Sequence, residues 1–199
     1  MGNAVIVHLI RHEKTKANIE RRYIGWTDES ILYKKAICHL PIDTNFVYGS
    51  DLKRCEETAK LYFPNANYQA EMNLRELHFG DFELKTYEQL KNNRVYRDWI
   101  DSPMEFTPPN GEHFIAFQER VLNGFQKIIS DSGKYVFVIH GGVIRVLLSV
   151  FGNPKQEFKE IMCHHRTIYT LQWDQIDYLK EGKRCDRLSV EPITVKEIL

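Results

Sequence analysis

Residues 4–30 of the chain read AVIVHLIRHEKTKANIERRYIGWTDES. The first seven residues are apolar except for His8, and the run stops at Arg11 and His12. A continuous apolar run rich in β-branched residues is typical of a strand buried on both faces of a parallel sheet. Strands also leave sheets through ordinary polar loops, so an Arg-His pair alone does not identify a site. The rest of the chain decides what this pair means.

The bulk composition indicates a globular protein and argues against one class of partner. The chain has 199 residues, which fits one large α/β domain, and we therefore expect residues 1–199 to form a single domain. Lys plus Arg and Asp plus Glu each number 27, so the formal net charge is zero. A general nucleic-acid-binding protein normally shows a basic excess, so we expect no nucleic-acid partner.

Membrane and export signals are not recognisable in the sequence. No apolar run approaches the roughly 18–20 residues that span a bilayer, and we expect no membrane partner. The N-terminus lacks the basic-then-apolar layout and the small-residue cleavage site of a signal peptide. Scattered cysteines without a CxxC pair are expected to be reduced thiols in a cytoplasmic protein. These cysteines are Cys38, Cys55, Cys163 and Cys185.

Strand and helix patterns alternate along the chain. The clearest strand after the first is GKYVFVIHGG at 133–142, followed by a buried helix over 143–152 that Gly152 closes. Further strands are expected at 45–50, 166–173 and 185–193, and further helices at 50–63 and 112–129. Ser50 or Asp51 is the expected N-cap of the helix at 50–63, and its apolar stripe is Leu52, Cys55, Ala59 and Tyr62. The alternation predicts an α/β three-layer sandwich with a mostly parallel central sheet.

Two histidines are expected at one edge of this sheet. Ligands of α/β sheets bind beyond the carboxyl ends of the strands. Arg11-His12 and His140-Gly141-Gly142 each stand at that end of a predicted strand. The polar segment at about 83–111 carries several aromatic residues and ends in a Pro-Pro pair. We expect it to be an insertion that lies over this edge and forms part of a pocket wall.

Five sequence blocks resemble the histidine phosphatase superfamily, whose fold is phosphoglycerate-mutase-like. In chain order they are LIRHEKTKAN, SDLKRCEETA, LRELHFGDFE, PPNGEHFIAFQERV and VIHGGVIRVLL, and they are spread from residue 5 to about residue 150, a span of some three quarters of the chain. The short chain and the middle blocks are most similar to the branch of α-ribazole phosphatases and broad-specificity phosphatases. The resemblance implies phosphoryl transfer through a phosphohistidine.

The resemblance also implies a role for each histidine. His12 is the matching nucleophile, and its attacking nitrogen keeps a lone pair if a backbone carbonyl holds the other ring nitrogen as N–H. His140 is read as a protonated donor that faces His12 across the phosphate and stabilises charge in the transition state. The backbone N–H of Gly141 is expected to contribute at the start of the following helix.

Phosphate-binding residues follow from the same blocks. Arg11 and Arg54 supply planar guanidinium groups that suit phosphate oxygens, and Asn18 offers a neutral donor to these oxygens. Glu76 is the implied general acid, which must carry a proton to protonate the leaving alkoxide, and then serves as the base for water. Two arginines and an imidazolium offset the phosphate charge, so we expect no metal and no cofactor.

Each of these residues also has an ordinary structural interpretation. Arg54 and Asn18 could be solvated surface residues, Glu76 could pair with Arg75, and His140 could be a hydrogen-bonded histidine at a strand end. Another cluster, Cys163-His164-His165, matches no catalytic block. Cysteine and histidine are zinc ligands, but three adjacent residues without partners elsewhere in the chain do not make up the four ligands of a zinc site.

Glu13 departs from the family pattern, which usually has glycine directly after the nucleophile. If that glycine is needed for φ > 0, Glu13 strains the loop by about 1–3 kcal/mol or forces a different path. If the side chain turns inward, its carboxylate opposes the phosphate dianion and raises the pKa of His12. A third possibility is that Glu13 points to solvent or pairs with Lys14 or Lys16, with little effect.

Three functions remain open on the sequence. The first is a metal-independent phosphomonoester hydrolase acting on a small phosphorylated metabolite, with α-ribazole 5′-phosphate, a sugar phosphate or a phosphoglycerate as candidates. The second is a phosphoglycerate mutase-type phosphoryl transfer, against which the short chain argues. The third is a catalytically weak protein that binds a phosphate ligand, in which Glu13 has silenced catalysis. The sequence leaves the oligomeric state undetermined.

Overall fold

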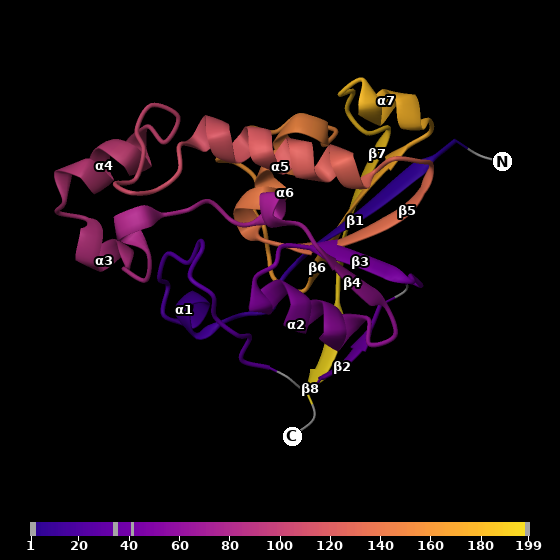
Figure 1. The fold of residues 1–199 in the computed structure, drawn as a ribbon, viewed down its shortest axis with the longest axis horizontal. Helices are drawn as coiled ribbons and strands as arrows, with labels where there is room; N and C mark the ends of the chain where they lie inside the picture. The colour runs from indigo at the N-terminus through magenta and orange to yellow at the C-terminus, as the bar shows by residue number, and fades with distance from the viewer. Residues whose placement is uncertain (1–2, 34–35, 41, 198–199) are drawn as a thin grey trace.

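The computed structural model describes residues 3–33, 36–40 and 42–197, and a six-stranded sheet forms its centre (Figure 1). The first four strands in the sheet order β4-β3-β5-β1-β6-β7 are mutually parallel, and β6 and β7 run antiparallel to their neighbours. The mostly parallel sheet predicted from the sequence is confirmed. Its strands are β4 (Asn67–Ala70), β3 (Phe46–Gly49), β5 (Gly133–Ile139), β1 (Val5–Arg11), β6 (Thr167–Trp173) and β7 (Arg187–Pro192). A separate antiparallel pair consists of β2 (Ala36–His39) and β8 (Thr194–Glu197).

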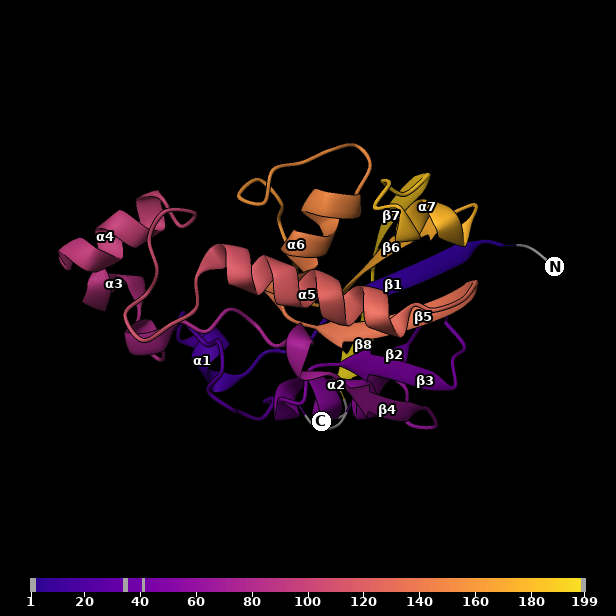
Figure 2. The same ribbon diagram turned by 45° about the horizontal axis from the view of Figure 1, so that its top comes forward.

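Strands β1 and β5 divide the core into two layers. Side chains alternate between the faces of a strand, so both faces of these apolar strands are buried. On one face Leu9 and Phe137 belong to the core under α5 (Phe114–Ile128) and α6 (Gly141–Phe151). On the other face Ile10 and Val138 belong to the core under α2 (Lys53–Tyr62). Helices therefore cover both faces of the sheet, as Figure 2 shows, and the predicted three-layer sandwich is confirmed.

The start of α2 differs from the prediction. Its N-cap is Leu52, without a side-chain capping bond, and neither Ser50 nor Asp51 takes that role. The Ser50 hydroxyl is hydrogen-bonded to His140 and accepts from the backbone N–H of Leu52 at 3.3 Å, and Asp51 pairs with Arg75, so neither side chain caps the first turn of α2. The predicted apolar stripe is buried, as expected: Leu52, Cys55, Ala59 and Tyr62.

Helix α6 begins two residues earlier than predicted. Gly141 and Gly142 form its first turn, and His140 is its N-cap. The predicted strands at 45–50, 166–173 and 185–193 correspond to β3, β6 and β7, and the predicted helix at 112–129 is α5. The short helices are α1 (Lys16–Ile19), α3 (Tyr87–Leu90), α4 (Arg94–Asp101) and α7 (Ile176–Lys180), with 3-10 turns at Met72–Leu74 and Gly80–Phe82. Within the described residues, no helix is long and apolar enough to cross a membrane.

Helices α3 and α4 lie within the segment 83–111 and project to one side of the sheet (Figure 1). An aromatic cluster attaches them to the rest of the chain. The hydroxyl groups of Tyr23 and Tyr96 are 2.6 Å apart, and the rings of Phe79 and Trp99 meet edge to face. Since Tyr96 and Trp99 are buried, α4 is fixed to the core by its aromatic side.

Candidate active site

The parallel pairing of β1 with β5 brings His12 and His140 together. Arg11 lies opposite Ile139 in this pairing, so the two histidines follow at the same edge of the sheet. The backbone N–H of His12 donates to the carbonyl of Ile139 at 2.9 Å. The two imidazole rings meet edge to face with their centroids 5.2 Å apart. This is the edge predicted from the two apolar runs that each end in a histidine.

His12 is held in the tautomer that a nucleophile needs. Its Nδ1 lies 2.7 Å from the carbonyl oxygen of Glu13, and a carbonyl only accepts, so Nδ1 carries the proton. Nε2 therefore keeps its lone pair. Burial, together with the positive charges of Arg54 and Arg11, lowers the pKa of His12 well below its usual value. The ring is neutral at pH 7, as predicted for the nucleophile.

His140 is also neutral, which differs from the protonated donor expected from the sequence. Arg54 donates through Nε to Nδ1 of His140 at 3.2 Å, so the ring proton lies on Nε2, which is 2.7 Å from the Ser50 hydroxyl oxygen. His140 is fully buried, and burial and the charge of Arg54 lower its pKa well below the usual value. A buried imidazole beside a guanidinium disfavours a second positive charge.

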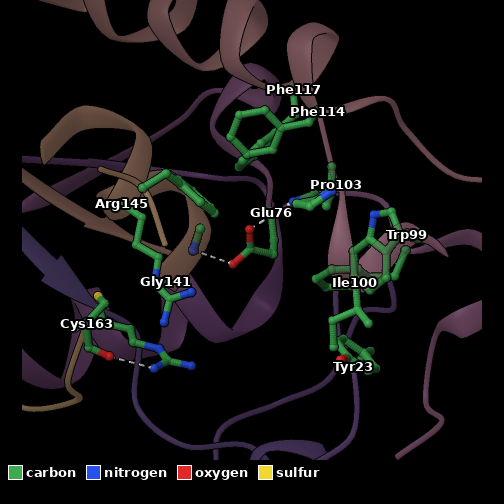
Figure 3. A pocket seen from close by; sticks show the side chains of 15 residues that line it. Tyr23, Glu76, Trp99, Ile100, Pro103, Phe114, Phe117, Gly141, Arg145 and Cys163 are labelled. Carbon is green, nitrogen blue, oxygen red and sulfur yellow. Dashed lines mark hydrogen bonds between the residues drawn. The ribbon is translucent and has the colours of Figure 1, made fainter. Parts of the chain in front are cut away.

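Two cavities meet near these histidines. The first, here called the aromatic cavity, measures about 330 Å³ (Figure 3). Its apolar wall includes Tyr23, Phe79, Trp99, Ile100, Pro103, Phe114, Phe117 and Phe158, and its polar lining includes Arg11, Glu76, Gly141, Gly142 and Arg145. The second, the basic cavity, measures about 460 Å³. It is lined by Arg11, Lys14, Asn18, Arg21, Arg22, Tyr23, Tyr87 and His165. Arg11 and Tyr23 belong to both cavities.

Arg11 and Asn18 offer donors to the basic cavity. Arg11 donates through Nη1 to the carbonyl of Cys163 at 2.9 Å, while its buried Nε has no hydrogen-bond partner in the described structure. Asn18 accepts from the backbone N–H of Thr15 through Oδ1, as part of the capping box of α1. The amide NH₂ of Asn18 is therefore the group left to donate, as predicted for a phosphate contact.

Arg54 lies behind His140 and lines neither cavity. It is fully buried, so it is not a solvated surface residue. Beyond its bond to His140, it donates through Nη1 to the carbonyl of Thr27 at 2.8 Å and through Nη2 to the carbonyl of Gly25 at 2.6 Å. These bonds fix the guanidinium next to the imidazole. Its direct contact with phosphate stays a prediction.

Glu76 reaches the aromatic cavity and is held by backbone donors. Its Oε2 accepts from the N–H of Gly142 at 2.8 Å, and its Oε1 accepts from the N–H of Leu77 at 2.9 Å. Arg75, the alternative partner considered from the sequence, instead binds Asp51 through Nε at 2.7 Å. The first turn of α6 thus positions the carboxyl group that was predicted to act as the acid.

Replacing Gly142 by alanine should displace this carboxyl group. A Cβ at position 142 would lie 2.1 Å from Oε1 of Glu76. Because misplacing a reacting group by about 1 Å can cost 10²-fold, we expect kcat on an alkyl phosphate to fall by about that factor. Ser149→Ala, on the same helix, is the matched control for folding. Unchanged kcat in a well-folded Gly142→Ala protein would show that the position of Glu76 does not limit the reaction.

The structure adds His165, which the sequence blocks did not indicate. Its Nδ1–H donates to the carbonyl of His12 at 2.7 Å, and the two ring centroids are 5.8 Å apart. His165 precedes β6, whose antiparallel pairing with β1 brings its start to the carboxyl end of β1. Cys163 lines the aromatic cavity instead, so the Cys-His-His cluster divides between two cavities. In the polar lining of the aromatic cavity, Gly142 and Arg145 are the residues to which the sequence assigned no role.

The Glu13 side chain turns into the protein, but its carboxylate is bound by other side chains. It is buried at 1% exposure, and its Oε1 accepts from the Tyr62 hydroxyl and from Arg166 Nε at 2.9 Å. The non-glycine residues with positive φ in the described structure do not include Glu13, so it has no left-handed strain. Its ion-pair partner is Arg166, which is partly exposed and lies 153 residues further along the chain. The alternative in which Glu13 points to solvent or pairs with Lys14 or Lys16 is therefore excluded.

Lowering the pH from 7 to 5 should destabilise the fold through its buried histidines. Burial lowers the pKa of His165 to about 4, and the pKa values of His12 and His140 are also lowered. Below the unfolded value near 6.5, the unfolded chain binds protons that the folded chain does not. The free energy of unfolding should therefore decrease as the pH is lowered, by up to about 1.4 kcal/mol per pH unit for each such histidine.

Urea titrations between pH 7 and 5 measure this slope, and His165→Gln should make it shallower than in the parent. If the two slopes are equal, His165 is not held neutral.

The model of the histidine phosphatase superfamily (branch 1) matches residues 7–182. The chain belongs to this superfamily. A Salmonella typhimurium protein named adenosylcobalamin/alpha-ribazole phosphatase is 30% identical over 156 residues, which cover 71% of this chain and 76% of that protein. An Arabidopsis thaliana phosphoglycerate mutase-like protein 4 is 29% identical, with 87% and 86% covered. The crystal structure of the alpha-ribazole phosphatase from Shigella flexneri shares the fold, with a TM-score of 0.73 at 20% identity over 94% of this chain and 95% of that one.

These relatives confirm the family and the fold expected from the sequence blocks. Membership of the superfamily supports phosphatase activity.

Proposed function

We propose that this chain hydrolyses phosphate monoesters of small metabolites through a phosphohistidine on His12. The single observation that carries the proposal is the state of this side chain. It is a buried, neutral imidazole whose Nδ1–H is bound to a carbonyl, so that Nε2 presents a lone pair next to His140. A neutral imidazole fixed in this tautomer is a competent nucleophile at pH 7.

In the first step, Nε2 of His12 attacks phosphorus and the bond from phosphorus to the ester oxygen breaks. The electron pair of that bond goes to the leaving alkoxide, which takes a proton from Glu76. In the second step, Glu76 accepts a proton from water, and the resulting oxygen attacks the phosphohistidine. The bond from nitrogen to phosphorus breaks, inorganic phosphate leaves, and His12 is neutral again.

The transferred phosphoryl group meets a set of fixed donors. Arg11 and Asn18 line the basic cavity, and the N-terminus of α6 adds the N–H of Gly141. His140 stays neutral, because its Nδ1 accepts from the Nε–H of Arg54 and cannot also carry a proton, so the ring contributes a neutral Nε2–H donor. These groups supply the positive charge that the transition state needs, so we expect the rate to survive EDTA treatment within about twofold.

The substrate is proposed to be a small phosphorylated metabolite. The names of the curated relatives support α-ribazole 5′-phosphate, and a sugar phosphate fits the same phosphoryl site. A mutase-type transfer is the second candidate, because Lys14, Arg21 and Arg22 give the basic cavity more cations than one phosphoryl group needs. The third candidate was a binding protein silenced by Glu13. The carboxylate of Glu13 is bound to Arg166, so this reason for a silenced site no longer holds. The cytoplasmic location stays a prediction.

A phosphate-release assay tests the proposal. Phenyl phosphate, α-ribazole 5′-phosphate, a sugar phosphate and 3-phosphoglycerate should be compared by kcat/KM, each with and without EDTA. We expect release of inorganic phosphate from at least one ester. Phosphoglycerate with its bisphosphate primer distinguishes a mutase, which interconverts the isomers without net release. No release and no transfer with any ester would contradict the proposal.

A further inference from the structure

We propose that Arg145 binds an anionic group on the alcohol part of the substrate, inside the aromatic cavity. Under the proposed function, on which this inference rests, the preferred substrates are phosphate monoesters of a flat, largely apolar alcohol that carries a carboxylate, and these should be favoured over α-ribazole 5′-phosphate, which has none. The residue then selects among substrates, while the phosphoryl group is bound elsewhere.

Arg145 has no hydrogen-bonded or ion-paired partner among the described residues. It lies in α6, one turn after Gly141, and is half-buried. Its Nε is buried without a hydrogen-bond partner, and across the described residues no ion pair or hydrogen bond to its guanidinium is found. A charged group removed from water is costly unless it is paired and hydrogen-bonded. A guanidinium left in this state at a cavity wall is therefore suited to an incoming anion.

The guanidinium of Arg145 contacts an aromatic ring, and this contact leaves its N–H groups free to donate. The Cζ atom of Arg145 lies 5.8 Å from the ring centroid of Phe158, a cation–π distance. Figure 3 shows Arg145 on the opposite side of the cavity from Trp99 and Ile100, with the carboxyl group of Glu76 between the two sides. A flat ring in this space would contact aromatic walls, and its polar substituent would meet the guanidinium fork.

The other charged groups of the cavity are already engaged. Arg11 is bound to the carbonyl of Cys163 and also lines the basic cavity, where the phosphoryl group is proposed to lie. Among the described lining residues Glu76 is the one carboxylate, and its oxygens accept from Gly142 and Leu77. Arg145 is thus the cation that remains for the organic part of the ligand.

The chemistry of the site favours a carboxylate. A planar guanidinium binds a carboxylate through two parallel hydrogen bonds, which a lysine ammonium does not reproduce. The volume of about 330 Å³ lies at the small end of ligand pockets, enough for one substituted ring. The aromatic wall disfavours a strongly hydrated alcohol such as an open-chain sugar, so one anion on an apolar ring is the best fit.

Binding of uncleavable phosphonates tests this inference separately from catalysis. Benzylphosphonate and its 3-carboxy and 4-carboxy derivatives should be titrated by calorimetry into the parent protein and into Arg145→Met and Arg145→Lys. We expect one carboxy isomer to bind at least about tenfold more tightly than benzylphosphonate, in the range of a charge-assisted pair. Arg145→Met should abolish this preference, and Arg145→Lys should keep only part of it. Arg94→Met, in the same helix α4 as Trp99 but with its side chain 94% exposed, is the matched control.

Each outcome decides the inference. Equal affinity for benzylphosphonate and both carboxy derivatives in the parent protein would overturn it. So would an Arg145→Met protein that weakens all three ligands equally, because Arg145 would then bind the phosphonate. Hydrolysis of the corresponding benzyl phosphates is measured in parallel. If the carboxylate preference is present but no ester is hydrolysed, the proposed function fails while the Arg145 site stands.

Discussion

Replacing His12 by asparagine should remove phosphatase activity while leaving the fold intact. We expect kcat/KM for phenyl phosphate to fall by about 10⁴–10⁶-fold, because the side-chain amide cannot form the covalent intermediate. Asparagine can still donate to the carbonyl of Glu13, which Nδ1 of His12 binds in the structure. Steady-state assays at pH 7 measure the loss.

His164→Ala is the matched control for this experiment. His164 is exposed and belongs to the same Cys-His-His cluster as His165, so its removal should leave kcat/KM close to that of the parent. Circular dichroism and melting curves establish that both variants fold. If the His12→Asn protein keeps more than about a hundredth of the parent rate, another residue is the nucleophile.

Replacing Glu76 by glutamine should produce the second largest loss, and the loss should depend on the leaving group. An alkyl phosphate needs a proton on its departing oxygen, so we expect its rate to fall by about 10²–10⁴-fold. Phenyl phosphate has a better leaving group and should lose much less in the phosphorylation step. Single-turnover measurements on both esters separate this step from hydrolysis of the intermediate.

The ratio of the two losses is the diagnostic quantity for Glu76. Glutamine preserves the size of the side chain and can still accept from the N–H of Gly142 through its amide oxygen. A merely structural role would therefore affect both esters alike. Equal losses in single turnover would place the acid elsewhere and leave Glu76 as a residue that shapes the cavity.

The edge of the sheet that carries the site was predictable because its signals are local. The runs before His12 and His140 are apolar on both faces, and each ends in a histidine. Once both are assigned to parallel strands, the two rings must stand at the same edge, and the structure places their centroids 5.2 Å apart. The tautomer of His12 was also predictable, because the backbone next to a strand end offers a carbonyl.

The residues that the sequence did not predict depend on contacts between distant segments. Glu13 is bound to Arg166, and no pattern near either residue indicates that they meet. His165 reaches the site because β6 runs antiparallel to β1, and strand direction cannot be read from an apolar run alone. The neutral state of His140 follows from complete burial beside Arg54, a property of the packed structure. The sequence shows Arg145 only as a charged residue within a helix, and its position at the aromatic cavity is known from the structure.

The most direct test of the account is to trap the covalent intermediate. The protein should be mixed with a phosphate ester labelled at phosphorus and quenched in alkali within the first turnover, and the labelled residue should be identified by mass spectrometry. We predict a phosphoprotein that is stable in alkali and labile in acid, with the phosphoryl group on His12. A turnover that continues with no labelled protein, or with the label on a residue other than His12, would contradict the account.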